Sequence, residues 1–159
     1  QGILVFGKNQ KSAAGLSQQL QTGQMKKTYL ACVQGVPEEK EGTLENQMEK
    51  IPGSNLSRVV EEKTKNSKKA VLKYKVLKEK EGQSLLEIDL KTGRHHQIRV
   101  QLAHAGFPII GDTKYNEKED GKGEWKEMGL CASKLSFRHP QTGKKMEFQV
   151  NPDGNFPIV

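Results

Sequence analysis

The sequence predicts an α+β domain, with a mostly antiparallel mixed sheet and flanking helices. Segments of strand pattern outnumber segments of helical pattern, and many strands follow one another with only a turn between them. The chain has 159 residues, a length that one core can serve. We therefore expect residues 1–159 to form a single compact domain.

The first third of the chain predicts a strand, a helix and a second strand. Residues 2–6 are an apolar run typical of a strand. Ala13, Leu16 and Leu20 then recur at helical spacing, with Gly23 as a stop signal. The β-branched and apolar stretch 26–33 predicts a strand that ends at Gly35 and Pro37.

The middle of the chain predicts loops followed by a hairpin. Residues 38–69 are polar and poor in large apolar side chains, so we expect short strands joined by mobile loops. Residues 70–77 and 84–90 both alternate in part between apolar and charged, and they flank Glu81-Gly82. This pattern predicts a β-hairpin.

A second helix is predicted over residues 94–105. Ile98, Leu102 and Ala105 share one helical face, Gly106 follows at the stop position, and Pro108 comes shortly beyond. Residues 130–137 and 146–150 return to a strand pattern.

The composition favours a polyanionic partner without proving one. There are 26 Lys and Arg against 19 Asp and Glu, which gives a net charge of +7 and a pI near 9.4. Many proteins are mildly basic for solubility alone. No apolar run approaches the roughly 20 residues of a membrane span, so we expect a cytoplasmic location. We also expect a monomer. Cys32 and Cys131 stand alone and are typical of buried, unpaired thiols.

The densest group of functional side chains is Gly93-Arg94-His95-His96-Gln97-Ile98-Arg99, at the start of the second helix. Cations and amides there can meet phosphates or base edges. A solvated basic helix start explains the same residues equally well. His95 and Arg99 are one helical turn apart, which predicts that they address one site.

Other site chemistries find little support. His95 and His96 are adjacent and should point apart, and no carboxylate or cysteine nearby completes a ligand set, so we expect no metal. The sequence has neither a Gly-x-Ser-x-Gly nucleophile elbow nor a glycine-rich phosphate loop.

Four separated segments, in the right order, resemble the RluA-like (ribosomal large-subunit type) pseudouridine synthase family. They are Gln1 to Lys8, Lys27-Thr28-Tyr29-Leu30-Ala31, Thr92 to Val100 continued by His104, Gly106, Gly111-Asp112 and Tyr115, and Ser136-Phe137-Arg138-His139-Pro140. The resemblance implies a pseudouridine synthase fold and the isomerisation of uridine to pseudouridine in structured RNA, ribosomal or transfer, without cofactor or metal.

The resemblance also implies roles for individual residues. Tyr29 matches the tyrosine that stacks on the base and takes part in proton transfer, and Arg99 matches the arginine that pairs with the catalytic aspartate. Arg94, His95, His96 and Gln97 would contact RNA. A core strand tyrosine and a structural ion pair are the alternatives for Tyr29 and Arg99.

The aspartate of the family's Arg-Leu-Asp motif should lie a few residues before Gln1. We therefore expect this chain to lack the N-terminal part of the catalytic domain and to be inactive alone; the alternative is a non-catalytic RNA-binding module of the same fold. Asp112 is expected to order the turn that follows it. His95 and Gln101 depart from the residues usual at their positions, Ser or Thr and His respectively.

Overall fold

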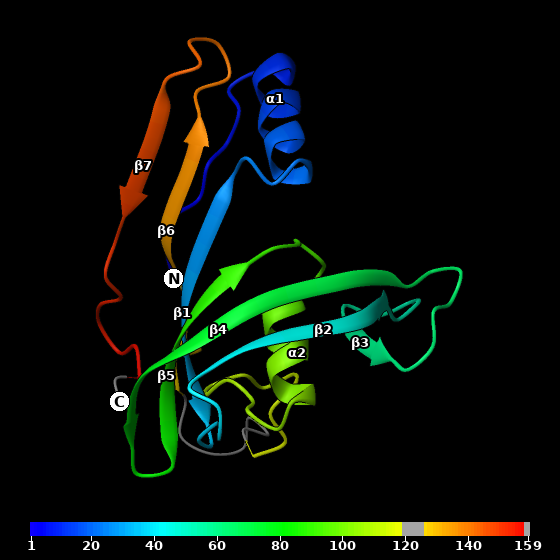
Figure 1. Ribbon diagram of the computed structural model, residues 1–159, viewed down its shortest axis with the longest axis vertical. Coiled ribbons are helices and arrows are strands. Elements are labelled where there is room, and N and C mark those ends of the chain that lie inside the picture. Colours follow the sequence, from blue (N-terminus) through cyan, green and yellow to red (C-terminus); the bar gives the residue numbers. More distant parts are fainter. Residues whose placement is uncertain (119–125, 158–159) are drawn as a thin grey trace.

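The computed structural model describes residues 1–118 and 126–157 (Figure 1). The described residues form one seven-stranded sheet of order β3-β2-β4-β5-β1-β6-β7, in which all neighbouring strands are antiparallel. The strands are β1 (Lys26–Gln34), β2 (Glu41–Lys50), β3 (Ser57–Val60), β4 (Lys68–Lys80), β5 (Gln83–Leu90), β6 (Leu130–Arg138) and β7 (Lys145–Gln149), and the helices are α1 (Gln10–Gln21) and α2 (Gln97–His104). The predicted α+β class is confirmed.

The core lies between the middle of the sheet and α2. Ala31 and Val33 of β1 are fully buried in one cluster with Ile98 and Leu102 of α2. Figure 1 shows α2 on one side of the sheet, with β2, β3 and β4 extending beyond it and α1 standing beside β6. No described helix has the length and apolar character of a bilayer-spanning segment.

β4 and β5 form a hairpin whose two-residue turn is Glu81-Gly82. Glu81 and Gly82 have φ angles of 51° and 74°. Positive φ at both central residues is what a two-residue type I′ hairpin turn requires. The predicted hairpin is confirmed, and β4 is longer than the predicted strand.

The second predicted helix starts later than its periodicity suggested. α2 begins at Gln97, because His96 adopts the left-handed conformation (φ 53°) and the residues before it form a turn. Its end agrees with the prediction. Gly106 has a φ of 89°, its N–H bonds to the Ala103 carbonyl (3.0 Å), and the Phe107 N–H bonds to the Leu102 carbonyl (2.9 Å), as in a Schellman motif.

α1 has the predicted location but buries a narrower face. Leu16 and Gln19 are buried, whereas Leu20 is 41% exposed. The helix meets the sheet at the end of β6, where the Gln19 amide donates to the Arg138 carbonyl (2.7 Å) and accepts from the Arg138 N–H (2.7 Å). Because α1 meets the sheet at the end of β6, it buries a single row of side chains and not a broad face.

Two predictions about the strands were wrong. Residues 2–6 form no strand; they make a single parallel bridge, Gly2 to Ala132. Residues 38–69, predicted as short strands and mobile loops, contain the ten-residue β2. β2 pairs with both β3 and β4, so it needs few apolar side chains of its own beyond the inward-facing Leu44 and Met48.

Candidate functional site

The guanidinium of Arg99 is held by a carboxylate of the same chain. Arg99 Nε donates to Asp112 Oδ2 (2.8 Å) and Nη2 donates to Oδ1 (2.6 Å). The Asp112 side chain has no solvent exposure, and that of Arg99 retains 13%. The ring of Tyr115 lies beneath the guanidinium carbon, 5.0 Å from it. The cation is therefore fixed in position on two sides.

Asp112 also organises the loop that carries Tyr115. Its Oδ1 accepts hydrogen bonds from the backbone N–H groups of Lys114 (3.0 Å) and Tyr115 (3.3 Å), which is the turn-ordering role expected from the sequence. Burial by itself would raise the pKa of Asp112. The hydrogen bond from Arg99 and the two backbone donors outweigh burial and hold this pKa below its usual value.

His95 and His96 lie face to face, contrary to the expectation that they point apart. Their ring centroids are 3.9 Å apart and the ring planes differ by 28°. The alternation expected of neighbouring side chains fails here because His96 has a left-handed backbone. The two rings form a stacked pair immediately before α2 in the sequence.

The His96 ring is held in its neutral form. The Tyr115 hydroxyl accepts from the Ser57 N–H (3.0 Å) and also lies 2.8 Å from His96 Nδ1, within hydrogen-bonding distance. Burial, reinforced by the positive charge of Arg99, lowers the pKa of His96 to about 4.

His95 is hydrogen-bonded to Asn55, which lies between β2 and β3, and to Ser57 at the start of β3. Its Nδ1 is 2.8 Å from Ser57 Oγ, and its Nε2 is 2.9 Å from Asn55 Oδ1. The predicted same-face pairing of His95 and Arg99 is wrong, because His95 precedes the helix. Tyr115 connects His95 and Arg99 indirectly. Its hydroxyl accepts from the N–H of Ser57, the residue that binds His95, and its ring lies against the Arg99 guanidinium.

Gln97 is used by the fold. Its side chain is buried (3% exposed), its Oε1 accepts from Thr92 Oγ1 (2.8 Å) and from the Arg94 N–H (3.0 Å), and its Nε2 donates to the Val71 carbonyl (3.1 Å) and Gln101 Oε1 (2.9 Å). All four hydrogen-bonding positions of the amide are thus occupied. Gln97, which was predicted to contact RNA, therefore holds the turn and the helix together through its buried amide. Arg94, also predicted to contact RNA, is exposed.

Tyr29 lines a cavity whose lining residues do not include Arg99. Tyr29 sits in the middle of β1 and packs partly against the core, and the cavity measures about 360 Å³. Ile3, Leu4, Phe6 and Met128 are among the other lining residues, and Leu4 and Phe6 are 78% and 80% exposed. Burial raises the pKa of the Tyr29 phenol. Within residues 1–118 and 126–157, no hydrogen bond joins Tyr29 to Arg99.

Sequence reasoning missed the members of the site that come from distant segments. Asp112 and Tyr115 were part of the third motif, but their contacts with Arg99 had no local signal. Ser57 and Asn55, which both bind His95, lie 38 and 40 residues before it. In the described part of the chain, no group of three His, Cys, Asp or Glu side chains could hold a metal ion.

The RNA pseudouridylate synthase family profile matches residues 1–104. The chain belongs to this family. The resemblance to the RluA-like pseudouridine synthases is thereby confirmed. An uncharacterized RNA pseudouridine synthase of Mycoplasma pneumoniae is 34% identical over 155 residues, which cover 98% of this chain and 50% of the relative. One of Bacillus subtilis is 34% identical over 151 residues, which cover 94% of this chain and 48% of the relative.

The chain thus spans about half the length of these curated pseudouridine synthases. Two solved structures share its fold. Human RNA Pseudouridylate Synthase Domain Containing 1 has a TM-score of 0.75 at 24% identity, covering 92% of this chain and 62% of the human chain. Domain Containing 4 has a TM-score of 0.75 at 22% identity, covering 93% and 66%.

Proposed function

We propose that residues 1–159 are the larger, C-terminal part of the catalytic domain of an RNA pseudouridine synthase. The enzyme would isomerise a uridine of structured RNA, ribosomal or transfer, in the cytoplasm as a monomer. Family membership supports the reaction class. The observation that carries the proposal is the partly enclosed Arg99, which lies in the matching family motif and is fixed by Asp112 and Tyr115.

Arg99 can serve a catalytic aspartate without releasing Asp112. A guanidinium has five N–H donors. Asp112 uses one N–H on Nε and one on Nη2, which leaves both protons of Nη1 and the second proton of Nη2. One proton of Nη1 and one of Nη2 point the same way and form a second edge for another carboxylate. A catalytic aspartate supplied by an upstream segment would bind there and be kept ionised.

Tyr29 would receive the base. A uridine must leave its stack before an enzyme can reach its glycosidic bond, and an aromatic face stabilises the displaced base. The cavity beside Tyr29 measures about 360 Å³ and has mainly apolar walls. That volume is within the range of small-ligand sites, roughly 300 to 1,000 Å³.

RNA would be held by charge around the turn that precedes α2. Arg94 is exposed there, the His95 and His96 rings are stacked beside it, and the whole chain carries a net charge of +7. Gln97 takes no direct part because it is buried. The enzyme would need no cofactor or metal, as in the rest of the family.

The test compares this chain with a longer protein that includes the Arg-Leu-Asp motif expected upstream of Gln1. Each is incubated with ribosomal and transfer RNA, and pseudouridine is measured by mass spectrometry. We expect isomerisation only with the longer protein, and its loss in Arg99→Met and Tyr29→Phe variants of that protein. Lys78→Met is the control, because Lys78 is exposed and is not among the residues that line the Tyr29 cavity.

Turnover by the 159-residue chain alone would refute the assignment of the nucleophile. If the longer protein instead bound RNA without isomerising any uridine, it would be a non-catalytic RNA-binding module of this fold.

A further inference from the structure

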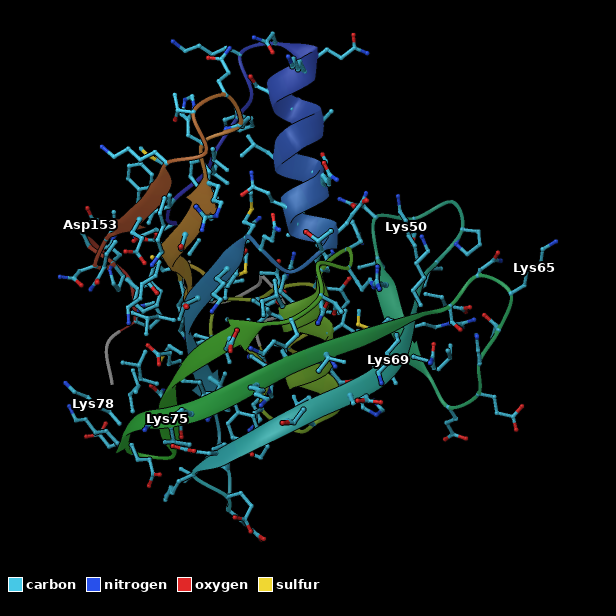
Figure 2. All side chains as sticks on the ribbon, turned by 45° about the horizontal axis from the view of Figure 1, so that its top comes forward. Lys50, Lys65, Lys69, Lys75, Lys78 and Asp153 are labelled. Carbon is cyan, nitrogen blue, oxygen red and sulfur yellow. The ribbon has the colours of Figure 1, made fainter. Side chains whose placement is uncertain are left out.

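A second cavity is lined by His95 but not by Arg99. It measures about 310 Å³ and is formed by the end of β2, the starts of β3 and β4, and the turn before α2. Its basic side chains are Lys50 at the end of β2, Lys68 at the start of β4 and Arg94 in the turn. Figure 2 shows Lys50, Lys65 and Lys69 at this end of the sheet, opposite the end that carries Lys75 and Lys78.

The charge of this cavity is uncompensated. Glu49 is its only lining carboxylate, and it is already occupied by Arg58 Nε (3.0 Å), Arg58 Nη2 (2.7 Å) and Thr64 Oγ1 (2.9 Å). The hydrogen bonds from Arg58 and Thr64 lower the pKa of Glu49, so it stays ionised and paired. Lys50, Lys68 and Arg94 form no ion pair with any described residue. An anion is the missing counterpart.

The cavity is also shaped to present these cations. Arg94 Nε donates to the Lys69 carbonyl (2.8 Å), which fixes the arm of the side chain and leaves its terminal nitrogens available. Gly93 contributes no side chain to the wall. His95 forms another part of the wall, and its ring is held by Ser57 and Asn55. An arginine held through its Nε beside two exposed lysines is suited to a phosphate, whose oxygens accept several donors at once.

We propose that this cavity binds a backbone phosphate of the RNA substrate. The inference rests on the proposed function and adds to it a fixed point for the nucleic-acid strand. Ser57 makes the connection: its Oγ contacts His95 in this cavity, and its N–H donates to the Tyr115 hydroxyl, on whose ring Arg99 lies. His95 and Tyr115 would thus lie between the bound phosphate and Arg99. A phosphate contact there would position the RNA strand without recognising its sequence.

The test measures binding of a fluorescein-labelled oligouridylate to the 159-residue chain by anisotropy, from about 50 to 300 mM KCl. Lys68→Met and Arg94→Met are compared with Lys78→Met. Lys68 and Lys78 are exposed and lie on the same strand, ten residues apart. The spacing corresponds to about 33 Å, well beyond the Debye length of ~10 Å at 0.1 M salt, so the control removes the same charge far from the cavity.

We expect Lys68→Met and Arg94→Met each to weaken binding about three- to tenfold. Each should also lower the slope of log K against log salt by about 0.7, the value for one lost contact to a single strand. Lys78→Met should bind like the wild type, and all variants should keep the wild-type denaturant midpoint.

Equal weakening by all three substitutions would overturn the proposal in favour of diffuse attraction, and so would wild-type affinity in Lys68→Met and Arg94→Met. Neither result would touch the isomerisation test, which is made on the longer protein. A third possible result is that the chain ignores oligouridylate while inorganic phosphate shifts the NMR signals of the Gly93 to His95 amides. The ligand would then be a free anion and the RNA assignment would be wrong.

Discussion

Arg99 and Asp112 are joined by two parallel hydrogen bonds, and the carboxylate has no contact with solvent. The sequence left two alternatives for Arg99, a partner of the catalytic aspartate or a structural ion pair. The structure shows an ion pair within the chain. Arg99 is already part of a buried ion pair, so any role toward a catalytic aspartate is added to a structural one.

Replacing Arg99 should destabilise the chain itself. Arg99→Met leaves the Asp112 carboxylate buried without its charged donor, and breaking a buried pair from one side costs about 3 to 5 kcal/mol. Urea unfolding should show a clearly lower midpoint, with Lys78→Met unchanged. An Arg99→Met midpoint equal to that of the wild type would mean that the pair contributes nothing to stability.

The ion pair should also make stability depend on acid. Because the pKa of Asp112 is lowered by folding, its contribution is complete above the unfolded value of about 3.9 and is lost as the pH falls through the folded pKa. The advantage of the wild type over Asp112→Asn in unfolding free energy should therefore be constant from neutral pH to about pH 5 and shrink below it. A difference that stays constant into strong acid would contradict the assigned charge state.

His96 should remain neutral well below neutral pH. Burial and the charge of Arg99 lower its pKa to about 4, and its Nδ1 lies 2.8 Å from the Tyr115 hydroxyl. The His96 ring signals in NMR should therefore be constant from pH 8 to about pH 5.5 and move only in stronger acid. Tyr115→Phe leaves the burial and the neighbouring Arg99 charge in place, so the pKa of His96 should stay low in this variant. Titration of wild-type His96 near pH 6.5 would contradict the neutral state assigned to its ring.

The turn between β4 and β5 should respond to two substitutions in opposite directions. Gly82→Ala places a side chain at a φ of 74° and should cost about 1 kcal/mol of unfolding free energy. Glu81→Asn should stabilise the hairpin by about 0.5 kcal/mol, because Asn tolerates the left-handed conformation that Glu81 has adopted. Thermal denaturation of both variants measures the effect. Equal stability of the Gly82→Ala variant and the wild type would show that the turn is not under this constraint.

Several features were determined by the sequence because their causes are local. Alternating side chains on either side of Glu81-Gly82 specify a hairpin wherever they occur, and Gly106 after an apolar helical face specifies a helix end. The four family motifs identified the family for a similar reason: residue types and spacing are properties of the chain before it folds. The motifs singled out Tyr29 and Arg99 as candidate site residues, but they did not show which residues surround them.

The tertiary structure alone decided which groups meet. Asp112 is 13 residues beyond Arg99, and Ser57 is 38 residues before His95. The separation along the chain gives no measure of their distance, because the sheet and the packing of α2 bring them together. The left-handed backbone at His96 stacks the two histidines, and the burial of the Gln97 amide removes it from the surface. Side-chain directions can be predicted from spacing only in a regular helix with solvent on one side. Residues 94–96 precede the helix and the Gln97 side chain is buried, so neither condition holds there.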